Sequence, residues 1–487
     1  MADVVPFRGL RYNRETVSDL SRVISPPYDI ISPPEQKRYH EKSPFNAIHL
    51  DFGMEEPGDN EAGNRYTRAA GLLNQWLHDR VLVPEDAPAF YLCREEFLLG
   101  DGSTATRDGF IALIRLADFS EGVVLPHEET ASGPKADRLR LMQATGANLS
   151  AIYCLYSDPD HTVIGELHEG AGGGPDVQLE DEAGTVHSLW VVDDPEHTAA
   201  VNAFLAGKTL LIADGHHRYE TALAYRDARR AEEADNAPEE GGAPEESPTG
   251  RPYDYLMVYL TDMDNTGPAI LPIHRFVSGL DATTAENLPA ALSEKFEVTE
   301  IAGGEDGASA AGNSGAATRA AVTGDTRPGD LIAAMNAAGS DRNAFGMYLP
   351  ATGRYYLLTG REPRPLFEDS GNGSGQAGKS AAYRSLDVAV LDRVILADVL
   401  GIRTGGANES AKVRFAERTE TAFEEIAAVA SGGDDASAPG FDAAFFLNPT
   451  SMQEIKAVAE AGEKMPQKST YFYPKPVTGL VFRSFSF

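Results

Sequence analysis

Apolar residues along the chain recur with the periods of both strands and helices. The segments 88–98 and 107–117 flank the turn sequence GDGS, whose glycines and aspartate supply turn conformations, and this indicates a β-hairpin. Short apolar runs elsewhere predict strands, and we expect the last two of them to pair with each other. These runs lie at 148–156, 209–215, 254–263 and 268–277.

Helical spacing of apolar residues appears in three places. One helix is predicted from His216 to about residue 230, directly after the strand at 209–215. A second covers 385–401 and ends at Gly401, which is suited to a helix C-cap, and a third covers 412–430. Strands and helices alternate irregularly, so the fold class we expect is α/β of the mixed α+β kind.

Four low-complexity stretches interrupt this pattern and are predicted to be flexible insertions. They are rich in Gly, Ala, Ser or acidic residues, and the first holds seven acids and no base. They divide the chain into an N-terminal α+β region, 1–230, and a C-terminal α+β region, 251–487. The insertions are 231–250, 302–328, 369–380 and 431–439.

Composition limits the classes of partner. The 487 residues include 74 acidic and 42 basic side chains, a net charge of −32. This charge repels phosphate backbones and anionic lipids, so we expect no nucleic-acid partner and no membrane partner. The chain has 11 lysines and 31 arginines. Few lysines and many acids are typical of surfaces in very salty cytoplasm, which suggests a halophilic host; a merely acidic protein is the alternative.

The chain carries no sign of export. It has no run near the roughly 18 apolar residues of a membrane helix. Its N-terminus, MADVVPFRGLRYN, lacks a basic segment followed by an apolar one. The two cysteines, Cys93 and Cys154, cannot form a disulfide framework. We therefore expect a cytoplasmic location.

The segment ADGHHRYETAL, residues 213–223, gives the sharpest chemical signal. A strand ends at Asp214-Gly215, and a helix begins at once with His216, His217 and Arg218. The first amides of a helix attract anions, Gly215 allows close approach, and the histidines and arginine add donors for phosphate oxygens. Asp214 can cap the helix or hold Mg²⁺. An N-capped helix with surface histidines explains the same residues.

A second polar segment lies at 126–138. His127 or Glu128 can serve as a general base, and Lys135 or Arg138 can hold a transferring phosphate. An amphipathic helix from 135 to 144 is the alternative explanation. A third segment is rich in lysine, although the chain otherwise avoids this residue. Its Lys468, Ser469 and Thr470 can contact nucleotide phosphates or an acidic substrate, and so can Lys475. A C-terminal strand packed through Tyr471, Phe472 and Tyr473 is the alternative explanation.

Several motifs together resemble a known family, domain of unknown function 1015. They run in order along nearly the whole chain outside the four insertions. Their sequences include VVPFRGLRYN (4–13), VISPPYDIIS (23–32), SPFNAIHLDFG (43–53), VLPHEETASGPKADRLRL (124–141), ADGHHRYETAL (213–223), ILPIHRFV (270–277) and MPQKSTYFYPKPVTGLVF (465–482).

The residues Asp214 to Arg218 also resemble the Asp-Gly-His-x-Arg phosphate motif of the ParB/sulfiredoxin superfamily. They are most similar to the form found in free serine kinases, with His217 where those enzymes have threonine. This resemblance implies a ParB/sulfiredoxin-like nucleotide-binding core with additional α+β elements. It also implies that an N-terminal acid is the catalytic base, and Asp29 is the candidate by position. The alternative role of Asp29 is to satisfy the amides of a turn.

These observations give three hypotheses for function. The first is a phosphotransferase that uses ATP or ADP with Mg²⁺ and a small hydroxyl metabolite, with free serine suggested by the resemblance. In this hypothesis Asp29 or Glu128 takes the hydroxyl proton. The second is a non-catalytic regulator that binds nucleotide, and the third is a hydrolase of a nucleotide or phosphoester. All three need the same anion site at 214–218. The chain has no Walker loop, no HExxH and no GxSxG.

Overall fold

The computed structural model describes residues 2–99, 102–130, 132–236, 250–265, 269–301, 328–367, 378–403, 412–430 and 440–486. Two compact units divide the chain: unit 1 comprises Met1–Ala269 and Phe472–Phe487, and unit 2 is Ile270–Tyr471. The sequence placed the division within 231–250 and assigned 251–487 to one region, so the units have different bounds. In the described part of the chain, no helix has the length and apolar character needed to cross a bilayer.

Unit 1 is built on a nine-stranded mixed sheet. Two of its strand pairs, β6 with β11 and β8 with β12, are parallel, and the others are antiparallel. Across the sheet the strands are β6 (Val124–Leu125), β11 (Leu210–Asp214), β8 (Ile152–Tyr156), β12 (Tyr255–Asp262), β5 (Thr104–Arg115), β4 (Phe90–Leu98), β10 (Val186–Val192) and β9 (Val177–Glu180), with β1 (Val4–Val5) beside β5.

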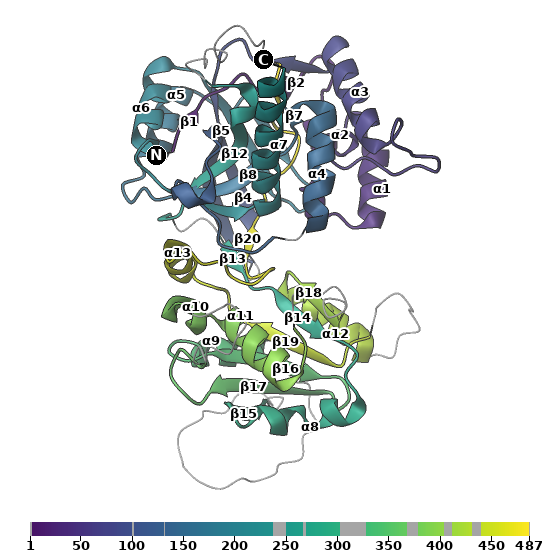
Figure 1. Ribbon diagram of the computed structural model, residues 1–487, viewed down its shortest axis with the longest axis vertical. Helices are drawn as coiled ribbons and strands as arrows, with labels where there is room; N and C mark the ends of the chain where they lie inside the picture. Colours follow the sequence, from purple (N-terminus) through teal and green to yellow (C-terminus); the bar gives the residue numbers. More distant parts are fainter. Residues whose placement is uncertain are drawn as a thin grey trace. The chain divides into compact units, whose positions relative to one another are not determined.

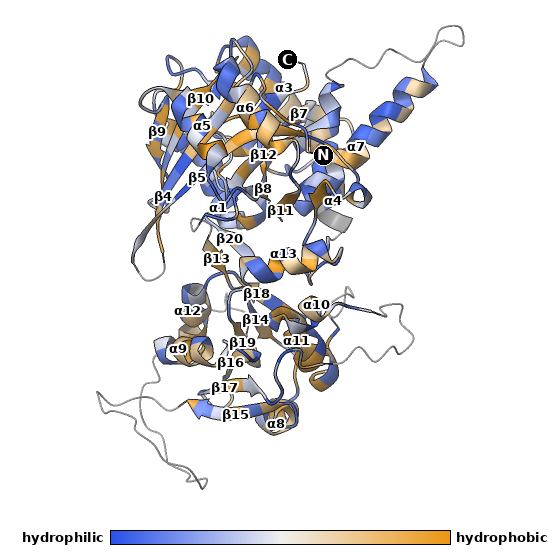
Figure 2. Ribbon diagram, turned by 90° about the vertical axis from the view of Figure 1, so that its left-hand side faces the viewer, coloured by the Kyte–Doolittle hydropathy of each residue, from blue (hydrophilic) through white to orange (hydrophobic). Residues whose placement is uncertain are grey.

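The main core of unit 1 lies on one face of this sheet. Helices α5 (Thr162–Ala171), α6 (Pro195–Leu205) and α7 (His216–Asp235) pack there through Val163, Val201 and Tyr219. Alternate residues of a strand point to opposite faces, so the second face carries the other set of side chains, including Tyr153 and Tyr259. Helix α7 runs beside α4 (Ser132–Thr145) (Figure 1), and its C-terminal half is mostly hydrophilic (Figure 2).

The remaining elements of unit 1 are short or lie outside the large sheet. Helix α3 contacts both α4 and α2. Two small strand pairs, β2 with β3 and β7 with β21, complete the unit. The bounds are β2 (Leu10–Tyr12), β3 (Leu82–Pro84), β7 (Ala147–Asn148), β21 (Arg483–Ser484), α1 (Pro33–Lys42), α2 (Ile48–Asp51), α3 (Arg65–His78), and the 3₁₀ turns Leu20–Arg22, Tyr28–Ile30, Phe119–Glu121 and Pro252–Asp254.

Unit 2 has its own antiparallel sheet of six strands. Phe276, Tyr348 and Phe446 of the sheet pack with Leu331 and Ile426 of two helices. The strands, in order across the sheet, are β15 (Phe296–Ile301), β17 (Arg354–Gly360), β16 (Ala344–Leu349), β19 (Ala443–Leu447), β14 (His274–Val277) and β18 (Val413–Ala416). The helices are α8 (Ala282–Leu292), α9 (Pro328–Ala338), α10 (Ala381–Ser385), α11 (Asp387–Val390), a π-helix (Leu391–Val399), α12 (Thr419–Ala430) and α13 (Met452–Glu460). Strands β13 (Ala269–Leu271) and β20 (Tyr471–Tyr473) contain the unit boundaries.

The mixed α+β class is confirmed, and so is the hairpin, which the structure forms from β4 and β5. Two sequence predictions were wrong. The segment 254–263 does not pair with 268–277, because β12 pairs with β5 and β8, whereas β14 pairs with β18 and β19. The predicted helix over 412–430 begins with strand β18 instead, since its alternating residues complete the sheet edge beside β14.

Most of the predicted insertions lie outside the described residues, namely 237–249, 302–327, 369–377 and 431–439. At two insertion boundaries the structure shows regular helix. Residues 231–235 form the end of α7, where alanine and glutamate favour helix, and Pro328 begins α9.

Candidate functional site

The junction of β11 and α7 places the residues of the strongest motif. Strand β11 ends at Asp214, Gly215 follows as the helix N-cap, and α7 begins at His216. Gly215 has a φ of +94°, and a Cβ atom there would lie 2.8 Å from a side-chain carbon of Ile152. Only glycine fits this turn without strain. Since glycine has no side chain to cap the first amides of α7, the backbone at this junction suits an anion.

Asp214 lies between two cations. Nη2 of Arg218 donates to Oδ2 of Asp214 at 2.9 Å, and Nζ of Lys475 lies 2.8 Å from Oδ1 of the same carboxylate. The ammonium of Lys475 also donates to Oδ2 of Asp29 at 2.5 Å. One lysine therefore joins two carboxylates from distant parts of unit 1. We call Asp29, Asp214, Arg218 and Lys475 the carboxylate–lysine cluster.

The two cations of this cluster keep their charges although they are largely buried. Burial acts to lower the pKa of Lys475, but Asp214 and Asp29 outweigh it, so the pKa is raised above its ordinary value. Burial likewise opposes the charge of Arg218, and Asp214 and Asp29 raise its pKa overall. Only 5% of the Lys475 side chain is exposed, compared with 30% for Asp29. Asp29 is therefore the member that a ligand can reach most easily.

Arg218 also anchors the start of α7 to strand β8. Its Nη1 atom donates to the carbonyl of Ala151 at 2.8 Å and to the hydroxyl of Ser150 at 3.2 Å. The sequence prediction gave Arg218 a phosphate-binding role. In the structure the guanidinium is held by Asp214, Ser150 and Ala151, so it fixes the position of Asp214.

Arg138 lies in a second buried network next to Arg218. Its Nη1 atom donates to the backbone carbonyl of Asp51 at 2.9 Å, and its Nη2 atom lies 2.6 Å from Oδ2 of Asp137. Burial raises the pKa of Asp51, even though Arg138 and Arg218 act to lower it. A cavity of about 40 Å³ borders Asp51, Arg138, Ser150 and Arg218. This is room for a few water molecules rather than for a nucleotide.

The two candidate histidines His127 and His216 are buried. Their rings pack edge to face with centroids 4.7 Å apart, and the backbone amide of His127 donates to Nε2 of His216 at 3.3 Å. Nδ1 of His127 lies 2.5 Å from the carbonyl oxygen of Ile212. Burial lowers the pKa of His127 to about 4, so the ring is neutral at pH 7. These contacts give both rings a place in the core beneath the helix start, and Glu128 beside them is half-buried.

His217 and Lys135 lie on the more open side of α7. The ammonium of Lys135 donates to Oε2 of Glu220 at 2.6 Å and to the hydroxyl of Thr130 at 3.2 Å. Burial lowers the pKa of His217, while Glu220 acts to raise it and Lys135 to lower it. Asp29 and Asp214 act on His217 too, so its imidazole lies close enough to the carboxylate–lysine cluster to interact with it electrostatically.

The other candidates belong to unit 2. The ammonium of Lys468 donates to Oε1 of Glu417 at 2.8 Å, and the hydroxyl of Ser469 donates to the carbonyl of Pro466 at 2.5 Å. Thr470 is half-buried beside them. The structure therefore unites Asp29 with the 214–218 motif inside unit 1, and it does not unite Lys468, Ser469 and Thr470 with them in one unit.

Sequence reasoning named Lys475 only as a further phosphate contact, and it did not predict that this lysine joins Asp29 to Asp214. The available signal was its chemistry, because lysine is rare in this chain and four of the 11 lie between 456 and 475. Asp51 and Ser150 gave no such signal, since aspartate is abundant here and serine is common in any sequence. Among the residues that the structure describes, no group of three His, Cys, Asp or Glu side chains is arranged to hold a metal ion.

Residues 4–389 match the model of a protein family described as "Protein of unknown function (DUF1015)". The chain belongs to this family. The match extends through unit 1 to Ala269 and on into unit 2, and it confirms the membership expected from the sequence motifs. No curated protein matches the chain.

Solved structures resemble the chain at low identity. A mutant free serine kinase in complex with ADP is 12% identical with a TM-score of 0.33, and the alignment covers 74% of this chain and 87% of that one. A conserved hypothetical protein from Pyrococcus furiosus is also 12% identical, with a TM-score of 0.33 and coverage of 77% and 96%. C-terminally truncated SbnI from Staphylococcus aureus is 11% identical, with a TM-score of 0.29 and coverage of 76% and 85%.

Proposed function

We propose that this protein transfers a phosphoryl group from ATP or ADP to the hydroxyl group of a small metabolite. The nucleotide phosphates would bind at the start of α7, where Gly215 has no side chain to prevent close approach. Free serine is the acceptor suggested by the resemblance of residues 214–218 to the motif of free serine kinases. The proposal rests on the side chains of this chain.

The observation that carries the proposal is the carboxylate–lysine cluster beside the helix start. Asp214 comes directly before Gly215, and Lys475 links Asp214 to Asp29 at 2.8 and 2.5 Å. Phosphoryl transfer depends mainly on positioning and on stabilising negative charge. A buried ammonium next to a helix N-terminus supplies the positive charge that stabilises the phosphate oxygens. A nearby carboxylate supplies a proton acceptor.

In this mechanism Asp29 is the general base. The acceptor hydroxyl would give its proton to Asp29 while its oxygen forms a bond to the terminal phosphorus. The bond between that phosphorus and the bridging oxygen breaks, and the shortened nucleotide leaves. Lys475 and the amides of α7 would stabilise the charge on the phosphate oxygens, and His217 would donate to them.

Magnesium would be held jointly by this cluster and the phosphate oxygens of the nucleotide. Mg²⁺ in such sites is usually held by one or two carboxylates together with phosphate oxygens, and it supplies charge neutralisation. Asp214 provides such a carboxylate, and Lys475 already lies against it. We therefore expect Mg²⁺ to bind together with the nucleotide rather than before it.

The test is incubation with ATP or ADP labelled at the terminal phosphate, Mg²⁺ and a pool of hydroxyl metabolites that includes serine. Label on a metabolite supports the proposal. Release of free phosphate alone would indicate a hydrolase, and retention of nucleotide without turnover would indicate a regulator. The matched control is Asp29→Asn, which keeps the size of the side chain and should abolish transfer while nucleotide binding persists.

A further inference from the structure

A buried ion pair lies on the second face of the unit 1 sheet. Arg107 on β5 and Glu95 on β4 occupy directly opposed positions in the antiparallel register. They are 1% and 3% exposed. Nε of Arg107 donates to Oε2 of Glu95 at 2.7 Å. Both charges are therefore fully removed from water inside the sheet layer.

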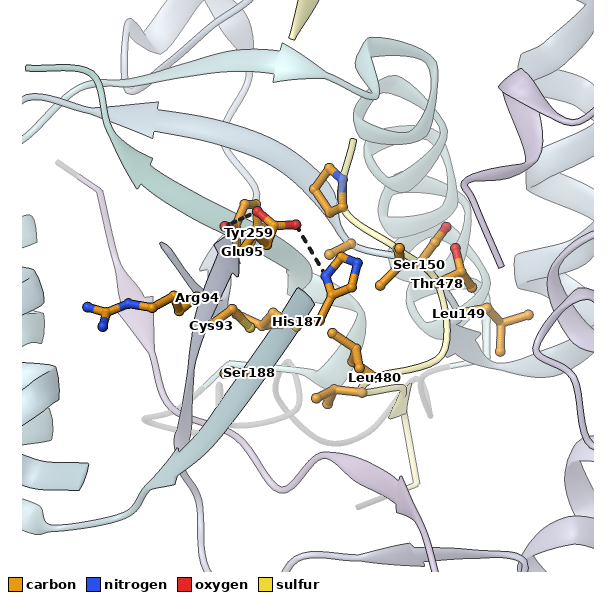
Figure 3. A pocket seen from close by; sticks show the side chains of 15 residues that line it. Cys93, Arg94, Glu95, Leu149, Ser150, His187, Ser188, Tyr259, Thr478 and Leu480 are labelled. Carbon is orange, nitrogen blue, oxygen red and sulfur yellow. Dashed lines mark hydrogen bonds and ion pairs between the residues drawn. The ribbon is translucent and has the colours of Figure 1, made fainter. Parts of the chain in front are cut away.

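Two tyrosines and His187 also lie beside this pair. The guanidinium of Arg107 lies 5.0 Å from the ring centre of Tyr153 and 5.4 Å from that of Tyr259. The hydroxyl of Tyr259 donates to Oε2 of Glu95 at 2.9 Å. Figure 3 shows Glu95 and Tyr259 beside His187 at a small pocket that the 476–481 segment also borders. Its volume of about 20 Å³ has room for a water molecule, so it is not a ligand site.

The remaining contact of Arg107 leads to the candidate site. Its Nη2 atom donates to the backbone carbonyl of Pro474 at 2.6 Å, across 367 residues of sequence. Pro474 immediately precedes Lys475, whose ammonium joins Asp29 and Asp214. The neighbouring ring of Phe472 packs against Tyr153 with centroids 5.7 Å apart. Contacts with strands β5 and β8 thus hold the chain in place directly before Lys475.

Stability alone is a weak reason for such a pair. Removing two charges from water costs as much as their attraction returns, and apolar residues of similar volume often serve as well. A guanidinium differs from an apolar side chain in that it can bind a carboxylate and a carbonyl at fixed angles. What only Arg107 provides here is a charged donor aimed at the carbonyl of Pro474.

We propose that Arg107, held by Glu95, is a positioning residue that fixes Lys475 between Asp29 and Asp214. Its catalytic consequence rests on the proposed function, but the positioning itself does not. A purely structural role would make loss of the pair loosen the whole of unit 1. If Arg107 is a positioning residue, removing the pair should increase the mobility of Lys475 alone.

The test measures how fast each lysine of the full-length protein is acetylated by acetic anhydride, read by mass spectrometry. In Arg107→Gln/Glu95→Gln the two amides can bond to each other, but the charged donor to Pro474 is lost. We expect Lys475 to react about tenfold faster than in the wild type, since a lost charge-assisted hydrogen bond shifts an equilibrium by roughly that factor or more. Lys42, a lysine of unit 1 that is 21% exposed and donates to the carbonyl of Ser21, should react at an unchanged rate.

The matched control is Arg94→Gln/Asp108→Asn. These residues form an opposed ion pair on the same two strands, one position away and on the other face. The side chain of Arg94 extends away from the pocket in Figure 3. Removing this pair should leave Lys475 as slow as in the wild type. An unchanged rate at Lys475 in the Arg107 variant would overturn the proposal, and so would an equal acceleration at every lysine.

If the first variant does not fold, Arg107→Met/Glu95→Leu replaces the pair by apolar residues of similar volume, and the same criteria apply. The acetylation result does not depend on nucleotide. If the wild type transfers no phosphate and binds no nucleotide, the proposed function fails, whereas the reactivity of Lys475 still decides whether Arg107 positions it.

Discussion

At the scale of single residues, the candidate site consists of two cations and two carboxylates that compensate one another's charge. Asp214 faces Arg218 and Lys475, and Lys475 faces Asp29 as well. Two cations thus face two carboxylates, and three of the four side chains are largely buried. Removing one member leaves a buried charge without compensation, which costs more than the pair contributes. Each substitution of a buried member, Asp214, Arg218 or Lys475, should therefore affect folding.

Lys475→Met tests this balance directly. Without the ammonium, Asp29 and Asp214 repel each other, so we expect the free energy of unfolding at pH 7 to fall by about 2 kcal/mol in urea titrations. The double variant Lys475→Met/Asp29→Asn should recover part of the loss, because one carboxylate is gone. Lys456→Met is the control on an exposed lysine and should be nearly silent. A double variant less stable than the single one would contradict this account.

His127 gives a prediction about pH. Burial lowers its pKa to about 4 from an ordinary value of 6.5. Between these values the unfolded chain binds a proton that the folded chain does not, so stability is complete above pH 6.5 and falls as pH drops toward 4. The loss approaches about 3 kcal/mol. His127→Gln should flatten this part of the stability curve in urea titrations from pH 4.5 to 7.

The control for this pH prediction is His78→Gln, since the His78 side chain is 87% exposed. It should keep the wild-type slope over the same range. If wild type and His127→Gln lose stability in parallel as pH falls, the buried imidazole is not the group responsible.

At the scale of elements, sequence patterns predicted those strands and helices whose formation depends on neighbouring residues in the chain. Strand β11 and the start of α7 were predicted almost to the residue, because an apolar run ends at an Asp-Gly turn. The predicted helix at 412–430 contains β18, which forms only because β14 lies beside it. The contact of Lys475 with Asp29 spans 446 residues, and no local pattern encodes it. Local patterns therefore predicted the motif and marked Lys475 as a phosphate contact, but they did not predict that Lys475 pairs with Asp29 and Asp214.

Gly215→Ala tests the junction that positions the motif. A side chain at a φ of +94° is strained, and its Cβ would lie 2.8 Å from Ile152, so we expect a loss of about 2–4 kcal/mol in unfolding free energy. Gly207→Ala is the matched control, because nothing lies within 4 Å of its added Cβ. That variant should differ from wild type by less than about 0.5 kcal/mol. Equal stability of the two variants would contradict the strained-turn explanation.

At the scale of the whole molecule, the order of the chain matters to the site. Unit 2 is inserted between Ala269 and Phe472, so the last segment returns to unit 1 and carries Lys475 with it. Sequence reasoning divided the chain once and therefore missed this return. The insertion makes the cluster depend on the final residues of the chain, which are held at Pro474 by Arg107 and at Thr478 by backbone hydrogen bonds with Ser25.

The net charge of −32 leads to the last prediction, which concerns the whole surface. Self-repulsion destabilises a compact chain, and the screening length falls from about 10 Å at 0.1 M salt to about 3 Å at 1 M. If the acidic surface is adapted to a salty cytoplasm, the free energy of unfolding should rise by at least about 1 kcal/mol between 0.1 and 2 M KCl, a measurable part of the 5–15 kcal/mol of a typical domain. Replacing the exposed acids Asp193, Glu286, Glu294 and Glu424 by lysine should reduce that rise, because less repulsion remains to be screened. Stability that falls in molar KCl, or a rise of equal size in the charge-reduced variant, would show that repulsion among these acids does not limit the folded state.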